Sequence, residues 1–155
     1  MSAKEKVIAL GFFDGVHLGH AALLRRTVEE AARRGVASAV FTFDRPPKEV
    51  VTGIPCPLIN SPQDRADLMR RLYGIQEVIM VPFDQEMMTT SWRDYITEIL
   101  VKRHHAIHLV AGHDHHFGHK NQGSPELLMQ TCAELGLGCD IIPKVELGGI
   151  TVSSS

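Results

Sequence analysis

No stretch of the 155-residue sequence approaches the run of about 20 apolar residues that a membrane-spanning helix requires. The first ten residues, MSAKEKVIAL, contain no long apolar segment of the kind found in secretory signals. The formal net charge is only −2, so no strong positive field favours nucleic acid. These absences predict a cytoplasmic protein with neither a membrane nor a nucleic-acid partner, and they leave the oligomeric state open.

Cysteine is also scarce in this sequence. The three cysteines, Cys56, Cys132 and Cys139, are odd in number and show no C-x-x-C spacing. Such a set does not make a disulfide framework and suits reduced thiols in the cytoplasm. We therefore expect the three side chains to fill space in the core or on the surface.

The sequence does contain a regular series of short apolar runs. Apolar residues make up 44% of the chain, enough for one domain with a substantial core. A short apolar run bounded by turn residues is typical of a buried strand. The predicted strands are Lys6–Leu10, Val36–Phe43, Glu77–Val81, Ile107–Ala111 and Gly138–Ile142.

Helices are predicted between these strands, because the intervening segments carry helix-start and helix-stop signals. Serine, alone or followed by proline, is a typical start, and glycine is a typical stop. The predicted helices are Leu18–Arg34 and those that run from Ser61 to about Tyr73, from Trp92 to about Arg103 and from Ser124 to about Gly136.

The alternation of strands and helices predicts the fold class. Continuously apolar strands are buried on both faces, which is typical of a parallel sheet covered by helices. We therefore expect an α/β protein with a doubly wound, five-stranded parallel sheet and helices on both faces. Ligands of such sheets bind at the carboxyl ends of the strands.

The string GFFDGVHLGH, residues 11–20, comes directly after the first predicted strand. Gly11 and Gly15 permit a tight turn and a close approach of the backbone to a ligand. A helix is predicted to begin within the string, and a helix N-terminus binds anions. His17 and His20 there can donate hydrogen bonds to phosphate oxygens and carry charge as it develops. The string therefore predicts a phosphate site; the alternative is one packed and one solvated histidine at a helix start.

The same ten residues resemble the HxGH region of the adenylyltransferase domain of bacterial FAD synthetases. Three further segments are similar to that family and occur in the family's order: FTFDRPP at 41–47, VAGHDHHFGHKNQG at 110–123 and ITVSSS at 150–155. Together they are spread over nearly the whole chain. The resemblance implies a Rossmann-like HxGH nucleotidyltransferase fold and a single FMN adenylyltransferase-like domain over residues 1–155.

The activity that the resemblance implies is transfer of AMP from ATP to FMN, giving FAD and pyrophosphate, with Mg²⁺ bridging the phosphate oxygens and no dedicated metal-binding residues. The reaction is an in-line attack of an FMN phosphate oxygen on the α-phosphorus, so positioning and electrostatic stabilisation carry most of the rate. His17 and His20 are the implied catalytic residues. The implied nucleotide and phosphate contacts are Gly11, Phe12, Asp14, Gly15, Gly112, Asp114, Ser153 and Ser154.

The sequence departs from the family pattern in three places. It ends at Ser155, before the arginine-bearing helix of the family, so we expect a domain truncated at its C-terminus and no riboflavin kinase domain. His115 stands where the family has phenylalanine, which is expected to weaken an apolar stacking surface near the nucleotide. The segment Arg45-Pro46-Pro47 lacks the histidine of the family's P-H-P form, which puts the flavin contacts in question.

Three other functions remain open at this point. One is transfer of an adenylyl or cytidylyl group to another small phosphate acceptor, and a second is flavin or nucleotide binding without turnover. The third is transition-metal binding, because imidazole clusters bind zinc, copper or nickel. Structural-zinc spacing of cysteines or carboxylates is missing, so no metal ligand is assigned. The clustered histidines are His104, His105, His108, His113, His115, His116 and His119.

Overall fold

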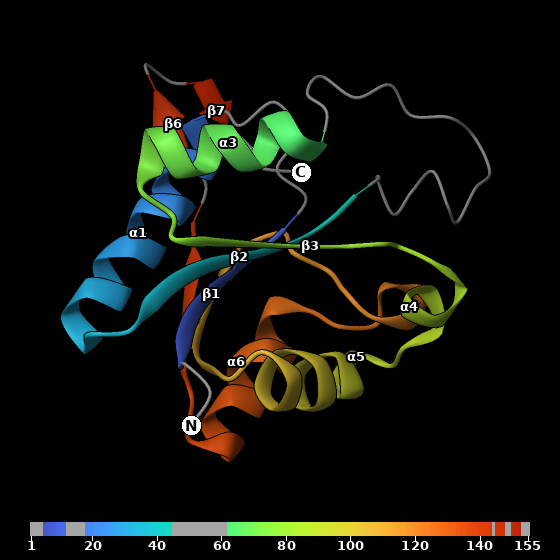
Figure 1. Cartoon of the computed structure of the whole chain (residues 1–155). Coiled ribbons are helices and arrows are strands. Elements are labelled where there is room, and N and C mark those ends of the chain that lie inside the picture. The colour runs from blue at the N-terminus through green and yellow to red at the C-terminus, as the bar shows by residue number, and fades with distance from the viewer. Residues whose placement is uncertain (1–4, 12–17, 45–61, 144, 148–149, 153–155) are drawn as a thin grey trace.

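The computed structural model describes residues 5–11, 18–44, 62–143, 145–147 and 150–152. Five strands form one parallel sheet in the order β3-β2-β1-β4-β5 (Figure 1). The strand order reverses direction between β1 and β4, so the sheet is doubly wound and the predicted fold class is confirmed. The strands are β1 (Lys6–Leu10), β2 (Ala37–Phe43), β3 (Glu77–Val81), β4 (Ala106–Gly112) and β5 (Gly138–Ile142).

Helices cover both faces of the sheet (Figure 1). One face carries α1 (Leu18–Arg34) and α3 (Pro62–Tyr73). The other carries α6 (Pro125–Leu135) and a continuous helical segment made of α5 (Trp92–Asp94) and the π-helix η1 (Tyr95–Arg103). The smaller elements are α4 (Gln85–Thr89), the 3₁₀ helix η2 (His119–Asn121) and an antiparallel hairpin of β6 (Val145–Leu147) and β7 (Ile150–Val152).

Each face of the sheet has its own apolar core. Along β1, Val7 and Ala9 pack with α1 and α3, whereas Ile8 and Leu10 pack with η1 and α6. All five residues of β1 are buried, because helices cover both faces of the central strand. This explains why the strands appear in the sequence as continuous apolar runs without polar alternation.

Most of the predicted elements are confirmed, with shifts of one residue at some ends. β2 begins at Ala37 and β4 spans Ala106–Gly112. The predicted caps Ser91 and Ser124 accept hydrogen bonds from the N–H groups of Asp94 and Leu127, both at 3.2 Å. Ser61 lies outside the described residues. None of the helices in the described ranges is long and apolar enough to cross a membrane.

The predicted helix from Trp92 to Arg103 needs one correction. It forms, but from Tyr95 onward it has π-helical geometry. Apolar spacing identifies a helix and its buried face, but it does not distinguish between neighbouring hydrogen-bond registers. The short elements α4, η2 and the β6–β7 hairpin were also not predicted, because each is only three to five residues long.

Candidate active site

The strand-order reversal brings the ends of β1 and β4 together at the carboxyl edge of the sheet. The two strands are parallel neighbours, and Ala9 is paired with Val110. Gly11 lies two residues after Ala9 and Gly112 lies two residues after Val110, so the two glycines lie side by side at the ends of adjacent strands. In doubly wound sheets a ligand binds at this switch point. Two of the residues implied to contact the nucleotide therefore share the expected edge.

Helix α1 begins shortly after β1 and returns across the sheet (Figure 1). Its first turn, which includes His20, contains no acidic residue, so nothing there opposes an anion at the positive end of the helix dipole. Its last turn carries Arg33 and Arg34, which complement the opposite end of the dipole. The other predicted residues His17, Phe12, Asp14, Gly15, Ser153 and Ser154 lie outside the described residues, and their roles stay predictions.

The segment that follows β4, residues 113–123, is held in place by backbone hydrogen bonds. His113 N–H donates to Ile142 O at the end of β5 (2.9 Å), and His119 N–H donates to Thr90 O (2.8 Å). Gly118 has a φ of +79°, and a Cβ at this residue would lie 2.5 Å from Trp92 Cα. The segment is thus fixed against β5 and the start of α5, and it places Asp114 directly after the β4 edge.

His115 packs as an aromatic ring inside this segment. Its imidazole stacks on Phe117 with a centroid distance of 5.4 Å, and Phe117 packs against Tyr95, also at 5.4 Å. Burial lowers the pKa of His115 to about 4, so the ring is neutral at neutral pH. The substitution that was expected to weaken a stacking surface therefore leaves a flat, uncharged ring that stacks on Phe117.

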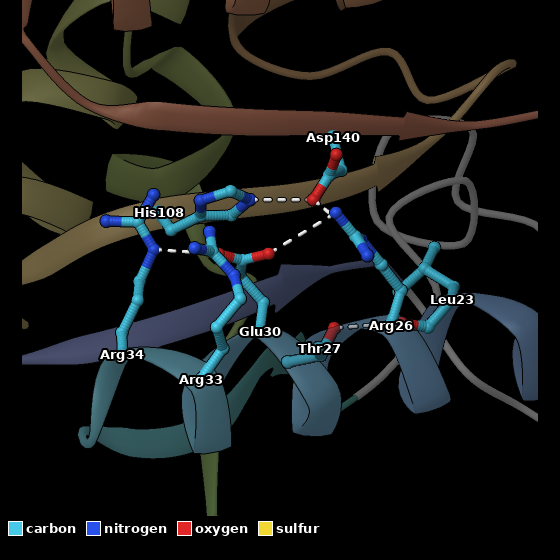
Figure 2. A network of polar contacts seen from close by, with 8 residues as sticks. All are labelled: Leu23, Arg26, Thr27, Glu30, Arg33, Arg34, His108 and Asp140. Carbon is cyan, nitrogen blue, oxygen red and sulfur yellow. Dashed lines mark hydrogen bonds and ion pairs between the residues drawn. The ribbon is translucent and has the colours of Figure 1, made fainter.

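The histidine cluster does not converge into a metal centre within the described ranges. One group of three potential ligands does meet there, and it comes from distant parts of the chain: Glu30 on α1, His108 on β4 and Asp140 on β5 (Figure 2). Their ligand atoms lie within 4.8 Å of one another. Of the clustered histidines, only His108 belongs to this group.

Arginines from α1 already satisfy the two carboxylates of this group. Arg34 Nε donates to Glu30 Oε2 (2.9 Å), and Arg33 donates to the same oxygen. Arg26 bridges Glu30 Oε1 (3.3 Å) and Asp140 Oδ2 (3.0 Å). The fifth contact is between His108 Nε2 and Asp140 Oδ2, at 2.8 Å (Figure 2).

The charges in this network favour a structural clamp over a cation site. Hydrogen bonding to Arg33, against the effect of burial and aided by Arg34, lowers the pKa of Glu30 to about 2. Burial would raise the pKa of Asp140, but hydrogen bonds from Arg26 and His108 outweigh it and lower that pKa. A divalent cation would have to displace three guanidinium groups. The network instead ties α1 to β4 and β5, and we call Arg26, Glu30, Arg33, Arg34, His108 and Asp140 the α1 clamp.

Sequence reasoning missed the α1 clamp. The spacing of Arg26, Glu30 and Arg34 at i, i+4 and i+8 was a partial signal, because these residues share one side of a helix. Such a pattern usually indicates a solvated helix face. His108 and Asp140, which lie 78 and 110 positions after Glu30, bury Glu30 only once the sheet has formed.

A doubly wound sheet with paired glycine-bearing strand ends and a helix beginning behind the first strand is typical of nucleotide-binding α/β proteins. The family model described as FAD synthetase matches residues 1–155, and this chain belongs to that family.

Similar proteins include two named bifunctional riboflavin kinase/FMN adenylyltransferase. The one from Listeria monocytogenes is 37% identical over 121 residues, which cover 77% of this chain and 38% of the relative. The one from Pseudomonas fluorescens is 33% identical over 154 residues, which cover 96% of this chain and 48% of the relative. This chain therefore spans less than half the length of either relative.

Among solved structures, one described as a macrolide-efflux protein from Streptococcus pneumoniae has a similar fold. The TM-score is 0.83 at 26% sequence identity, and the match covers 99% of this chain and 51% of that chain. The fold described above therefore matches about half of that solved chain.

Proposed function

We propose that this chain transfers AMP from ATP to FMN, giving FAD and pyrophosphate. The observation that carries the proposal is the family match over residues 1–155, together with the HxGH string that joins the central strand to the start of α1. In this reaction a phosphate oxygen of FMN attacks the α-phosphorus of ATP, the bond to the β-phosphate breaks, and pyrophosphate leaves.

The residues of the carboxyl edge have separate roles in this proposal. His17 and His20 contact the ATP phosphates and stabilise the charge that develops on them. The positive end of α1 adds to this stabilisation, because its first turn carries no acidic side chain. Gly11 and Gly112 let the nucleotide approach the backbone at the ends of β1 and β4.

The remaining predicted contacts surround these groups. Phe12, Asp14 and Gly15 line the nucleotide site in the β1–α1 connection. Asp114 lies near the adenosine, and Ser153 and Ser154 lie near the phosphates. Mg²⁺ enters with ATP as part of the substrate complex, held mainly by phosphate oxygens. We also propose that the reaction takes place in the cytoplasm.

A turnover assay tests the proposal. Purified chain is mixed with Mg²⁺, ATP and FMN, and both FAD and pyrophosphate are measured, with the Pseudomonas fluorescens relative as a positive control. In parallel, His20→Ala is compared with His105→Asn. His105 precedes β4 at the opposite edge of the sheet, and asparagine tolerates its positive φ of 59°.

We expect FAD and pyrophosphate in equal amounts from the unmodified chain. His20→Ala should lower turnover by on the order of 100-fold or more, because it removes a donor to developing charge. His105→Asn should leave turnover unchanged. Equal turnover of the two variants would contradict the role of His20. Binding of ATP and FMN without FAD would instead support a nucleotide-binding module, and product from a different phosphate acceptor would redirect the substrate assignment.

A further inference from the structure

Two of the three cysteines lie close together between α6 and β5. In the sequence they are distant from Gly11 and Gly112, the glycines at the carboxyl edge of the sheet. Cys132 lies on α6 and is buried, whereas Cys139 lies on β5 and is only partly buried. Both are free thiols, and Cys139 packs against the apolar core cluster to which Cys132 belongs. Their meeting was not expected from the sequence, which suggested only that they fill space.

The turn between α6 and β5 explains how the two side chains come together. Leu137 N–H donates to Cys132 O (2.8 Å) and Gly136 N–H donates to Ala133 O (3.3 Å). With Gly136 at a φ of +74°, this pattern is a Schellman motif, which reverses the chain at the end of a helix. The strand that follows returns along the buried side of α6, so Cys139 packs beside Cys132.

The side-chain interaction between the two thiols raises the pKa of Cys132 and lowers the pKa of Cys139. A thiolate is the nucleophilic form of cysteine, and access from solvent limits its reactions. Cys139 satisfies both conditions better than Cys132, so the two residues differ in role.

We propose that Cys132 and Cys139 form a redox-active dithiol that a hydroperoxide converts into an intramolecular disulfide. The Cys139 thiolate attacks a peroxide oxygen, the O–O bond breaks, and the alkoxide or hydroxide that leaves takes up a proton, so that Cys139 becomes a sulfenic acid. The Cys132 sulfur then attacks the Cys139 sulfur, the S–O bond breaks, and the Cys132 proton leaves with the hydroxyl as water. Two thiols lose two electrons in total, and the hydroperoxide gains them.

The bond would act on the segment at the candidate active site. A disulfide holds its sulfurs about 2.05 Å apart, closer than two free thiols can pack, so its formation draws α6 and β5 together. These two elements bound residues 113–123: α6 begins at Pro125, and Ile142 of β5 accepts the hydrogen bond from His113. Oxidation therefore has a direct mechanical route to that segment.

Peptide mapping of the native protein tests the proposal without any variant. The folded chain is treated with hydrogen peroxide, alkylated and cleaved after glutamate without reduction. Glu134 lies between the two cysteines, so cleavage there leaves two peptides that remain joined only by a Cys132–Cys139 bond. We expect the joined pair, lighter by two hydrogen atoms than the sum of the two peptides and separated again by dithiothreitol.

Three serine variants serve as controls. Cys56→Ser should form the same joined pair, whereas Cys139→Ser should not. Cys132→Ser should stop at a sulfenic acid on Cys139, which dimedone captures. Oxidation that leaves the native peptides unjoined, that links either residue to Cys56 or to a second chain, or that joins the pair only in urea would overturn the proposal. None of these outcomes depends on AMP transfer, so they test the dithiol separately from the proposed function.

Discussion

Replacing Glu30 with glutamine tests whether the α1 clamp stabilises the fold. The substitution keeps the side-chain volume and one carbonyl acceptor but removes the negative charge that three arginines share. Glu30 is 1% exposed, whereas the side chains of Arg26, Arg33 and Arg34 are 45%, 68% and 32% exposed. When Glu30 is replaced, the arginines can therefore hydrogen-bond to water instead, and this reduces the loss in the free energy of unfolding.

The expected magnitude follows from this difference in exposure. A hydrogen bond to a charged group contributes about 1.5–3 kcal/mol, and an exposed ion pair contributes about 0–1 kcal/mol. We expect Glu30→Gln to lower the free energy of unfolding at pH 7 by about 1.5–3 kcal/mol, the value of one buried charged hydrogen bond. The assay is urea unfolding. The matched control is Glu29→Gln on the exposed side of α1, with an expected loss below about 0.5 kcal/mol.

The pH dependence gives the sharper test. The pKa of Glu30 is about 2 in the folded protein, against 4.5 for an unperturbed glutamate. As the pH falls through 4.5 the unfolded chain takes up the proton first, so the stabilisation is present above that pH and is lost as the pH approaches 2. The stability difference between the unmodified protein and Glu30→Gln should shrink over this range. A difference that stays constant there, or that equals the effect of Glu29→Gln, would refute the clamp interpretation.

Substitutions at three further residues test the core, a helix cap and the histidine stack. Leu128→Ala should lower the free energy of unfolding, measured in urea, by about 2–5 kcal/mol, because Leu128 is fully buried between α6 and the sheet and its truncation leaves a cavity. A loss below about 1 kcal/mol, as expected for an exposed residue, would contradict that packing. Ser124→Ala should cost about 0.5–2 kcal/mol through loss of the cap on Leu127 N–H, and Ser124→Asp should restore most of it. Between pH 6.5 and 4, His115 is protonated in the unfolded chain but neutral in the folded protein. As the pH falls through this range, the unmodified protein should therefore lose stability relative to His115→Phe, which thermal unfolding at each pH measures. Parallel pH profiles would show that His115 is not buried as a neutral ring.

Much of the fold could be predicted because its signals are local. A strand buried on both faces is typically a continuous apolar run, as in Lys6–Leu10, and a helix start is favoured by a side-chain acceptor such as Ser91 or Ser124. The alternation of these elements leaves few topologies for a parallel sheet. The HxGH string was likewise recognisable, since its glycines, histidines and helix start are contiguous in the chain.

The candidate active site could be predicted only in outline. The sequence indicated the carboxyl edge and the residues on it, but the level at which Gly11 and Gly112 meet depends on the register between β1 and β4. The packing of His115 also depends on distant residues, because Tyr95 supports the Phe117 ring on which it stacks. No local pattern carries information about such contacts.

The α1 clamp and the cysteine pair show where local information ends. In the sequence, Glu30 is one of many charges on an amphipathic helix, and Cys132 and Cys139 are two scattered small residues. Only the folded sheet brings His108 and Asp140 against Glu30 and turns β5 back along α6. The order of residues along the chain thus determined where the strands, the helices and the HxGH string lie, because backbone conformation responds to neighbouring residues. Tertiary packing decided which carboxylate is buried, because His108 and Asp140 lie far from Glu30 in the chain. It also decided how the two thiols pack, because both lie against an apolar cluster built from residues of several distant elements.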